Sequence, residues 1–158
     1  MAKKLFVVVA VLALSLALHA QSTSDPSRLV GTWKLNPEKS KYSPGPGPRS
    51  QTLTWKPSAT GLDFTIDTVD AQGQKTQTQV SEKFDGKPYP FKTANYSGTR
   101  TSRFIDASTM EEIDTVDGKV RTTRRIAISK DGKVLTVTSK GVNAQGQPTN
   151  NVTVYERE

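Results

Sequence analysis

The segment 109–140, TMEEIDTVDGKVRTTRRIAISKDGKVLTVTSK, decides the fold class. Residues alternate along it with the period of two that is typical of β-strands, over 109–116, 119–128 and 133–140. Asp117-Gly118 and Asp131-Gly132 separate these runs, and Asp-Gly tolerates the positive φ angles of tight hairpins. The segment therefore predicts three antiparallel strands joined by two hairpins.

The same pattern extends toward both ends of the chain. Further strands are predicted at 31–35, 50–56, 62–67, 76–84, 88–92, 99–105 and 151–156. The dipeptides Asp85-Gly86, Gln72-Gly73 and Gln145-Gly146 supply turns, and no segment has a period of 3.6. Residues 36–49 hold four prolines and two glycines, which predicts an ordered loop. The predicted fold is therefore all-β, an up-and-down meander of about ten antiparallel strands. A closed barrel is favoured over a two-sheet sandwich because closure removes exposed edges.

Two turns share a sequence. Residues 69–76 read VDAQGQKT and residues 142–149 read VNAQGQPT. Either a ligand-binding loop is duplicated, or two hairpins use the same turn chemistry, because turns select strongly for a few residue types.

The first twenty residues have the layout of a secretory signal peptide. Lys3 and Lys4 precede an apolar run from Leu5 to Leu18, interrupted only by Ser15. This run is shorter than the roughly 20 residues that span a bilayer, so cleavage after residue 20 is favoured over a retained membrane anchor. The predicted organisation is a signal peptide at 1–20 and a single β-barrel domain at 21–158, located in the periplasm or secreted.

The predicted mature chain contains neither histidine nor cysteine. The sequence has no cysteine, and its one histidine, His19, leaves with the signal peptide. This excludes Ser-His-Asp and Cys-His nucleophiles, the usual zinc sites and a haem held by a proximal histidine. Glu111 and Glu112 are adjacent on a strand and point to opposite faces, so they cannot act as a catalytic pair. We expect a protein that is not an enzyme, with no cofactor and no metal.

The positive charge does not indicate nucleic-acid binding. The formal net charge is +7, and it falls to +5 without Lys3 and Lys4. Single-stranded nucleic acids stack on aromatic side chains, and Phe104 is the only aromatic residue in the two arginine-rich strands. We therefore expect no nucleic-acid partner and no stable membrane anchor after cleavage. The sequence does not predict an oligomeric state.

Both ends of the mature chain resemble a known family. Residues 31–35, GTWKL, look like the first strand of lipocalins and intracellular fatty-acid-binding proteins, and residues 155–158, YERE, resemble the end of the fatty-acid-binding branch. Residues 131–138, DGKVLTVT, are similar to that branch's penultimate hairpin. The chain also resembles uncharacterised exported bacterial lipocalin-like proteins. The resemblance implies a barrel whose base is closed by Trp33, with Arg157 packed across the ring.

The chain departs from the fatty-acid-binding pattern at two places. The proline-rich loop 36–49 stands where that family has two short helices, and Thr153 stands where it has an arginine two residues before the tyrosine. Because Val152 and Val154 form an apolar face, alternation predicts that Tyr155 points outward.

Candidate ligand-binding residues come from the inward faces of the predicted strands. Five arginines crowd two of these strands: Arg100, Arg103, Arg121, Arg124 and Arg125. Arg124 shares a face with Val120, Ile126 and Ile128, so it either meets the anionic end of a ligand or pairs with a carboxylate inside the barrel such as Glu112. The other candidate ligand-binding residues are Trp55, Phe64, Ile66 and Ile126, with Leu53 and Ile128 beside them.

The sequence supports two functions of different class. The first is an exported binding protein for a small apolar or amphipathic molecule. The second is a packed β-domain without a cavity that acts as a structural or interaction module, with the loop Pro44 to Pro48 contacting a partner protein. The interior volume distinguishes them, because a ligand site needs a cavity of a few hundred Å³.

Overall fold

The computed structural model describes residues 24–93, 96–143 and 145–158. The predicted signal peptide lies outside these ranges, as does its cleavage site. A short 3-10 helix, η1 (Pro26–Leu29), precedes ten strands. The strands are β1 (Gly31–Leu35), β2 (Ser50–Ser58), β3 (Gly61–Val69), β4 (Lys75–Glu82), β5 (Asp85–Lys92), β6 (Ser97–Phe104), β7 (Thr109–Val116), β8 (Lys119–Ile128), β9 (Val134–Val142) and β10 (Pro148–Arg157). No helix among the described residues is long and apolar enough to cross a membrane.

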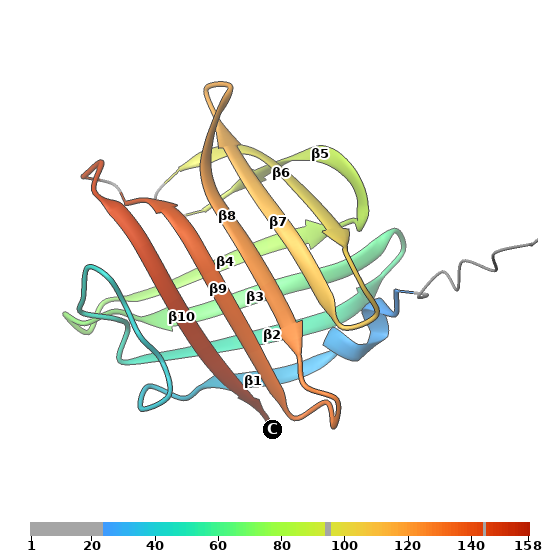
Figure 1. Ribbon diagram of the computed structural model, residues 1–158, viewed down its shortest axis with the longest axis horizontal. Coiled ribbons are helices and arrows are strands. Elements are labelled where there is room, and N and C mark those ends of the chain that lie inside the picture. The colour runs from blue at the N-terminus through green and yellow to red at the C-terminus, as the bar shows by residue number, and fades with distance from the viewer. Residues whose placement is uncertain (1–23, 94–95, 144) are drawn as a thin grey trace, which may run out of the picture.

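The ten strands form one antiparallel sheet that curls into a nearly closed barrel. Its order is β4-β3-β2-β1-β10-β9-β8-β7-β6-β5, so strands adjacent in sequence pair with each other except β4 and β5, and β1 pairs with β10. Figure 1 shows β1 to β4 crossing behind β7 to β10, as two walls of the barrel. The predicted all-β, up-and-down meander is confirmed.

The barrel has one seam, between β4 and β5. These strands are the two ends of the sheet order, and no backbone ladder joins them in the part of the chain that the structure describes. β5 carries Pro88 and Pro90, which lack a backbone N–H and are typical of edge strands. Side chains bridge the seam instead, since Arg100 on β6 reaches Glu82 on β4 at 2.9 Å.

The base of the barrel is closed by Trp33 and the residues around it. Trp33 is fully buried, and its indole N–H donates to the carbonyl oxygen of Leu29 at 2.8 Å. The predicted contact with Arg157 is present, with the guanidinium carbon 4.1 Å from the centre of the Trp33 ring. Arg157 also donates to the carbonyl oxygens of Arg28, Val30 and Gly132 at 2.6, 2.6 and 2.7 Å. One side chain thus ties the segment at η1 to the β8–β9 hairpin.

Gly31 makes this base possible. Its φ of +129° lies in a region that residues with a Cβ rarely adopt, and a Cβ there would stand 2.8 Å from the Nη1 atom of Arg157. A larger residue at 31 would push Arg157 away from Trp33.

Most of the predicted turns are present, and one is misplaced. Asp117 and Gly118 both have positive φ, as a tight β7–β8 hairpin requires. Asp85 and Gly86, predicted as a turn, instead begin β5, and an irregularity in pairing follows Asp85. Gly86 keeps the predicted positive φ, at +75°, and the Asp85 side chain accepts from the backbone N–H of Lys87 at 3.0 Å, so the turn chemistry lies at the irregular start of the strand.

The two turns with a shared sequence use the same hydrogen bonds. Asp70 accepts from the backbone N–H groups of Gln72 and Gln74, and Asn143 accepts from those of Gln145 and Gln147. These contacts are internal to each hairpin, which favours shared turn chemistry over a duplicated ligand loop.

The loop between β1 and β2 lies along β10. Lys41 forms a two-way backbone bridge with Val152, and Ser43 accepts from the backbone N–H of Asn150 at 2.8 Å. Because β1 has only five residues, this loop completes the wall where β1 ends. The prediction of an ordered loop is therefore confirmed.

The first prediction concerns the base. Trp33→Ala should lower the free energy of unfolding by about 3 to 5 kcal/mol, because a fully buried tryptophan is replaced by a cavity. Chemical denaturation measures the loss. Lys34→Ala, on the exposed face of the same strand, should change the unfolding free energy by less than about 0.5 kcal/mol. A loss below about 1 kcal/mol for Trp33→Ala would contradict the base-closing role.

Candidate functional site

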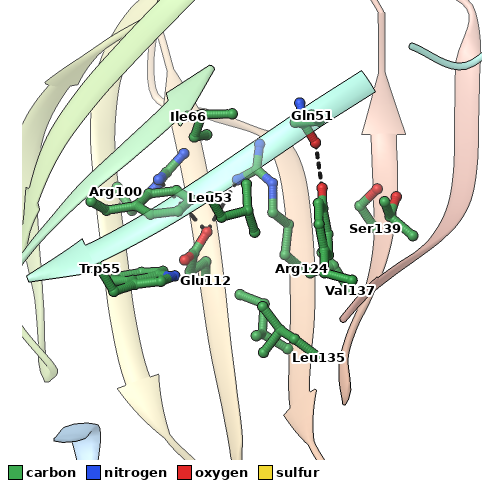
Figure 2. A pocket seen from close by; sticks show the side chains of 14 residues that line it. Gln51, Leu53, Trp55, Ile66, Arg100, Glu112, Arg124, Leu135, Val137 and Ser139 are labelled. Atoms are coloured by element: carbon green, nitrogen blue, oxygen red, sulfur yellow. Dashed lines mark hydrogen bonds and ion pairs between the residues drawn. The ribbon is translucent and has the colours of Figure 1, made fainter. Parts of the chain in front are cut away.

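The interior of the barrel contains a cavity of about 240 Å³. Its apolar side is formed by residues of β2, β3, β8 and β9, namely Leu53, Trp55, Phe64, Ile66, Ile126, Leu135 and Val137. The remaining lining residues are polar or amphipathic: Gln51, Arg100, Glu112, Arg124, Ser139, Thr153 and Tyr155. Figure 2 shows these side chains converging from opposite walls. A cavity with one apolar side and one charged side suits an amphipathic molecule.

The structure brings together the sequence-predicted candidates. Arg124, Trp55, Phe64, Ile66 and Ile126 all line the cavity. Trp55 and Phe64 are opposite each other on β2 and β3, and their rings stack with centres 4.0 Å apart. This stack forms a rigid aromatic surface. Whether these residues contact a ligand remains a prediction.

A buried carboxylate, Asp114, organises the charged wall. It has no exposed surface and lies opposite Arg100, on the neighbouring strand. The Arg100 Nε and Nη2 atoms donate to its two oxygens at 2.7 and 3.1 Å, Arg124 donates at 2.8 Å, and the Tyr96 hydroxyl donates at 2.9 Å. Burial favours the neutral acid, but the hydrogen bond from Arg100 and the charge of Arg124 outweigh it and lower the pKa of Asp114.

Arg124 is engaged by carboxylates inside the barrel. Besides Asp114, its Nη1 atom lies 3.5 Å from Glu112, the residue opposite it on β7. Of the two alternatives for Arg124, the internal partner is therefore observed, and Asp114 is the closer one. Sequence reasoning missed Asp114, because a carboxylate between Ile113 and Thr115 gives no sign of which face is buried.

Three carboxylates and two arginines meet in this wall. Glu82 accepts from Arg100 at 2.9 Å and from the hydroxyl of Ser102. Glu112 is only 3% exposed and has weaker contacts, 3.5 Å to Arg124 and 3.7 Å to Arg100. With every group ionised, the five side chains leave one net negative charge.

The unbalanced negative charge belongs to Glu112, the carboxylate with the longest contacts to the two arginines. Burial raises the pKa of Glu112 to about 7, an effect that the charges of Arg100 and Arg124 oppose and those of Glu82 and Asp114 reinforce. The carboxyl group therefore exchanges its proton near neutral pH.

The prediction that Tyr155 points outward is wrong. Tyr155 is 5% exposed, lines the cavity, and its hydroxyl donates to the side chain of Gln51. Residues two apart on a strand share a face, so the inward position of Arg157 also turns Tyr155 and Thr153 inward. The contact of Arg157 with Trp33, itself predicted, was the signal that would have placed Tyr155 correctly. Burial raises the pKa of the Tyr155 hydroxyl.

The prediction that Val120 shares the face of Arg124 is also wrong. Val120 is 65% exposed. Thr122 pairs with Asp114, but Val120 pairs with Thr115, so one extra residue of β8 bulges out between them. The bulge reverses the alternation for the first residues of β8, and no sequence feature marks its position.

The polar lining residues were the hardest to predict from the sequence. Gln51, Ser139 and Thr153 sit on inward faces, where an apolar pattern gives no signal. In the described ranges, no group of three or more carboxylate, histidine or cysteine side chains is arranged to hold a metal ion.

The fold has solved relatives at low sequence identity. Neither a scan against protein-family models nor a search of curated proteins finds a match. Among solved structures, a Schistosoma mansoni fatty acid binding protein in complex with arachidonic acid matches with a TM-score of 0.55, at 15% identity over 84% of this chain and 97% of that one. The fold is that of the fatty-acid-binding proteins.

Two further structures agree. As-p18, an extracellular fatty acid binding protein, gives a TM-score of 0.53 at 17% identity, over 86% of this chain and 100% of that one. Zebrafish ileal bile acid-binding protein complexed with cholic acid gives a TM-score of 0.51 at 12% identity, over 84% of this chain and 100% of that one. The barrel architecture is thus shared with proteins described as binding proteins, and the predicted resemblance is confirmed for the fold.

The second prediction follows from the pKa of Glu112. The folded protein holds the Glu112 proton up to about pH 7, whereas an unfolded glutamate releases it near pH 4.3. The stability contributed by the protonated group is therefore complete below about pH 4.3 and is lost as pH rises through about 7. The loss is at most about 4 kcal/mol, at roughly 1.4 kcal/mol per pKa unit.

Glu112→Gln should remove this decline, so the variant gains stability relative to wild type between pH 5 and pH 8. Urea denaturation at several pH values measures the difference. Glu111→Gln also removes one carboxylate, but from the outer face, where Glu111 pairs with Arg103. It should keep the wild-type decline. A constant difference between wild type and Glu112→Gln across this pH range would contradict the shifted pKa.

Proposed function

We propose that this chain is an exported, non-enzymatic binding protein that holds a small apolar or amphipathic molecule inside the barrel. The observation that carries the proposal is the cavity of about 240 Å³, with a Trp55–Phe64 stack on one side and charged groups on the other. A packed interaction domain would fill this space with side chains. The complexes of the fold relatives with arachidonic acid and cholic acid support a ligand of amphipathic character.

The cavity limits the size of the ligand. Sites for drug-sized molecules occupy roughly 300 to 1,000 Å³, and this one lies just below that range. At roughly 30 Å³ for each water in the liquid, it holds the volume of about eight waters. A short chain with one polar group fits this space, whereas a long-chain fatty acid would require the barrel to expand.

The third prediction uses the two tryptophans as reporters. Hexylamine, n-hexanol and hexanoate match the cavity in size, and one that enters should shift the NMR signal of the Trp55 indole N–H. The chemical shift of the Trp33 indole N–H should not change, because Trp33 lies in the base and its N–H is hydrogen-bonded to the Leu29 carbonyl oxygen. If none of the three probes moves the Trp55 signal, the binding function is contradicted.

A pair of variants localises the effect. Ser139→Phe places a ring in the cavity and should abolish the Trp55 shift. Thr138→Phe adds the same ring on the other face of β9 and should preserve it. Binding that survives Ser139→Phe would place the ligand elsewhere.

The fourth prediction concerns export. The proposed signal peptide should be removed near Gln21, delivering a chain of 138 residues to the periplasm or the medium. Intact-mass analysis of exported protein checks this. Retention of Met1 would contradict cleavage, and recovery of the protein only from the cytoplasm would contradict export.

A further inference from the structure

We propose that Glu112 and Trp55 together bind a hydroxyl group, so that the cavity prefers an uncharged alcohol to a carboxylate or an amine. This inference rests on the proposed binding function and names the chemical class of the ligand's polar end. It also replaces Arg124 by Glu112 as the residue that the ligand contacts.

The first argument is that the other charged groups already have their partners. Asp114 accepts four hydrogen bonds from three side chains, and both oxygens of Glu82 are occupied. Arg124 and Arg100 each donate to these carboxylates at short distances. A ligand carboxylate would have to displace Asp114 from Arg124, and it would add a second negative charge to a wall that already has one.

The second argument is that Glu112 has capacity left. A carboxylate accepts about four hydrogen bonds, yet both contacts of Glu112, at 3.5 and 3.7 Å, fall on the single oxygen Oε2. None of the hydrogen bonds found among the described residues uses Oε1. Glu112 lines the cavity and is 3% exposed. Its Oε1 atom is therefore placed to accept a hydrogen bond from a donor on a ligand in the cavity.

The third argument is an unpaired donor on the facing wall. Trp55 is 2% exposed, and its Nε1–H has no hydrogen-bond partner in the described structure. Figure 2 shows the nitrogen end of the Trp55 ring turned toward Glu112 across the cavity. A buried donor without a partner costs free energy, so a ligand atom that accepts from it gains affinity.

A hydroxyl satisfies both groups at once. It donates its hydrogen to Glu112 and accepts from the Trp55 N–H through an oxygen lone pair. An ammonium donates to Glu112 but has no acceptor for Trp55, and a carboxylate accepts from Trp55 but repels Glu112. The apolar remainder of the ligand then lies against Leu53 and Ile66, which line the same cavity.

The fifth prediction compares the three hexyl probes by calorimetry at pH 7.5. In wild type, n-hexanol should bind tightest. Trp55→Phe removes the N–H together with the five-membered part of the indole, and the packing loss should act on all three probes alike. Loss of the hydrogen bond should weaken n-hexanol and hexanoate by roughly three- to tenfold relative to hexylamine. Glu112→Gln should weaken n-hexanol and hexylamine and strengthen hexanoate.

Glu111→Gln, on the outer face of β7, is the matched control and should leave all three affinities at wild-type values. Tightest binding of hexanoate or hexylamine to wild type would overturn the hydroxyl assignment while leaving the binding function in place. So would n-hexanol binding that neither Trp55→Phe nor Glu112→Gln affects. Failure of every probe to bind wild type would instead remove the binding function itself.

Discussion

The burial of a single charge, that of Asp114, shapes the inner wall of this barrel. A carboxylate without exposed surface is tolerated only if it is fully hydrogen-bonded and paired with opposite charge. Arg100 and Arg124 supply that pairing from the strands on either side of β7. The requirement fixes how β6, β7 and β8 align, because a shift of one residue would turn these side chains to the outer face.

The same requirement determines the polarity of the cavity. Arg100, once it faces inward to meet Asp114, also reaches Glu82 on the far side of the seam. Arg124 is held against the wall and is unavailable as a free cation. The remaining carboxylate, Glu112, receives only long contacts from either arginine. A cavity that looks cationic from its arginines is therefore acidic where Glu112 lines it.

Sequence reasoning predicted the fold well because the period of two and the Asp-Gly turns act locally. It placed Trp55, Phe64 and Ile126 on the inner face of the barrel, where the structure has them, since each is an apolar residue on an alternating strand. It failed at Val120 because the position of a bulge depends on how two strands pair. The sequence of one strand alone does not reveal that pairing. It failed at Tyr155 because two valines suggested an apolar inner face, while the contact of Arg157 with Trp33 sets the alternation of β10.

The seam between β4 and β5 is held together differently from the rest of the barrel wall. Around the rest of the barrel, separating neighbouring strands means breaking a ladder of backbone hydrogen bonds, all of which must open together. At the seam, the bond from Arg100 to Glu82 joins the two sides, and side chains reorient singly and quickly compared with a sheet. A fluctuation that widens the barrel is therefore concentrated along this line. We expect the cavity wall to widen at the seam more readily than anywhere else in its circumference.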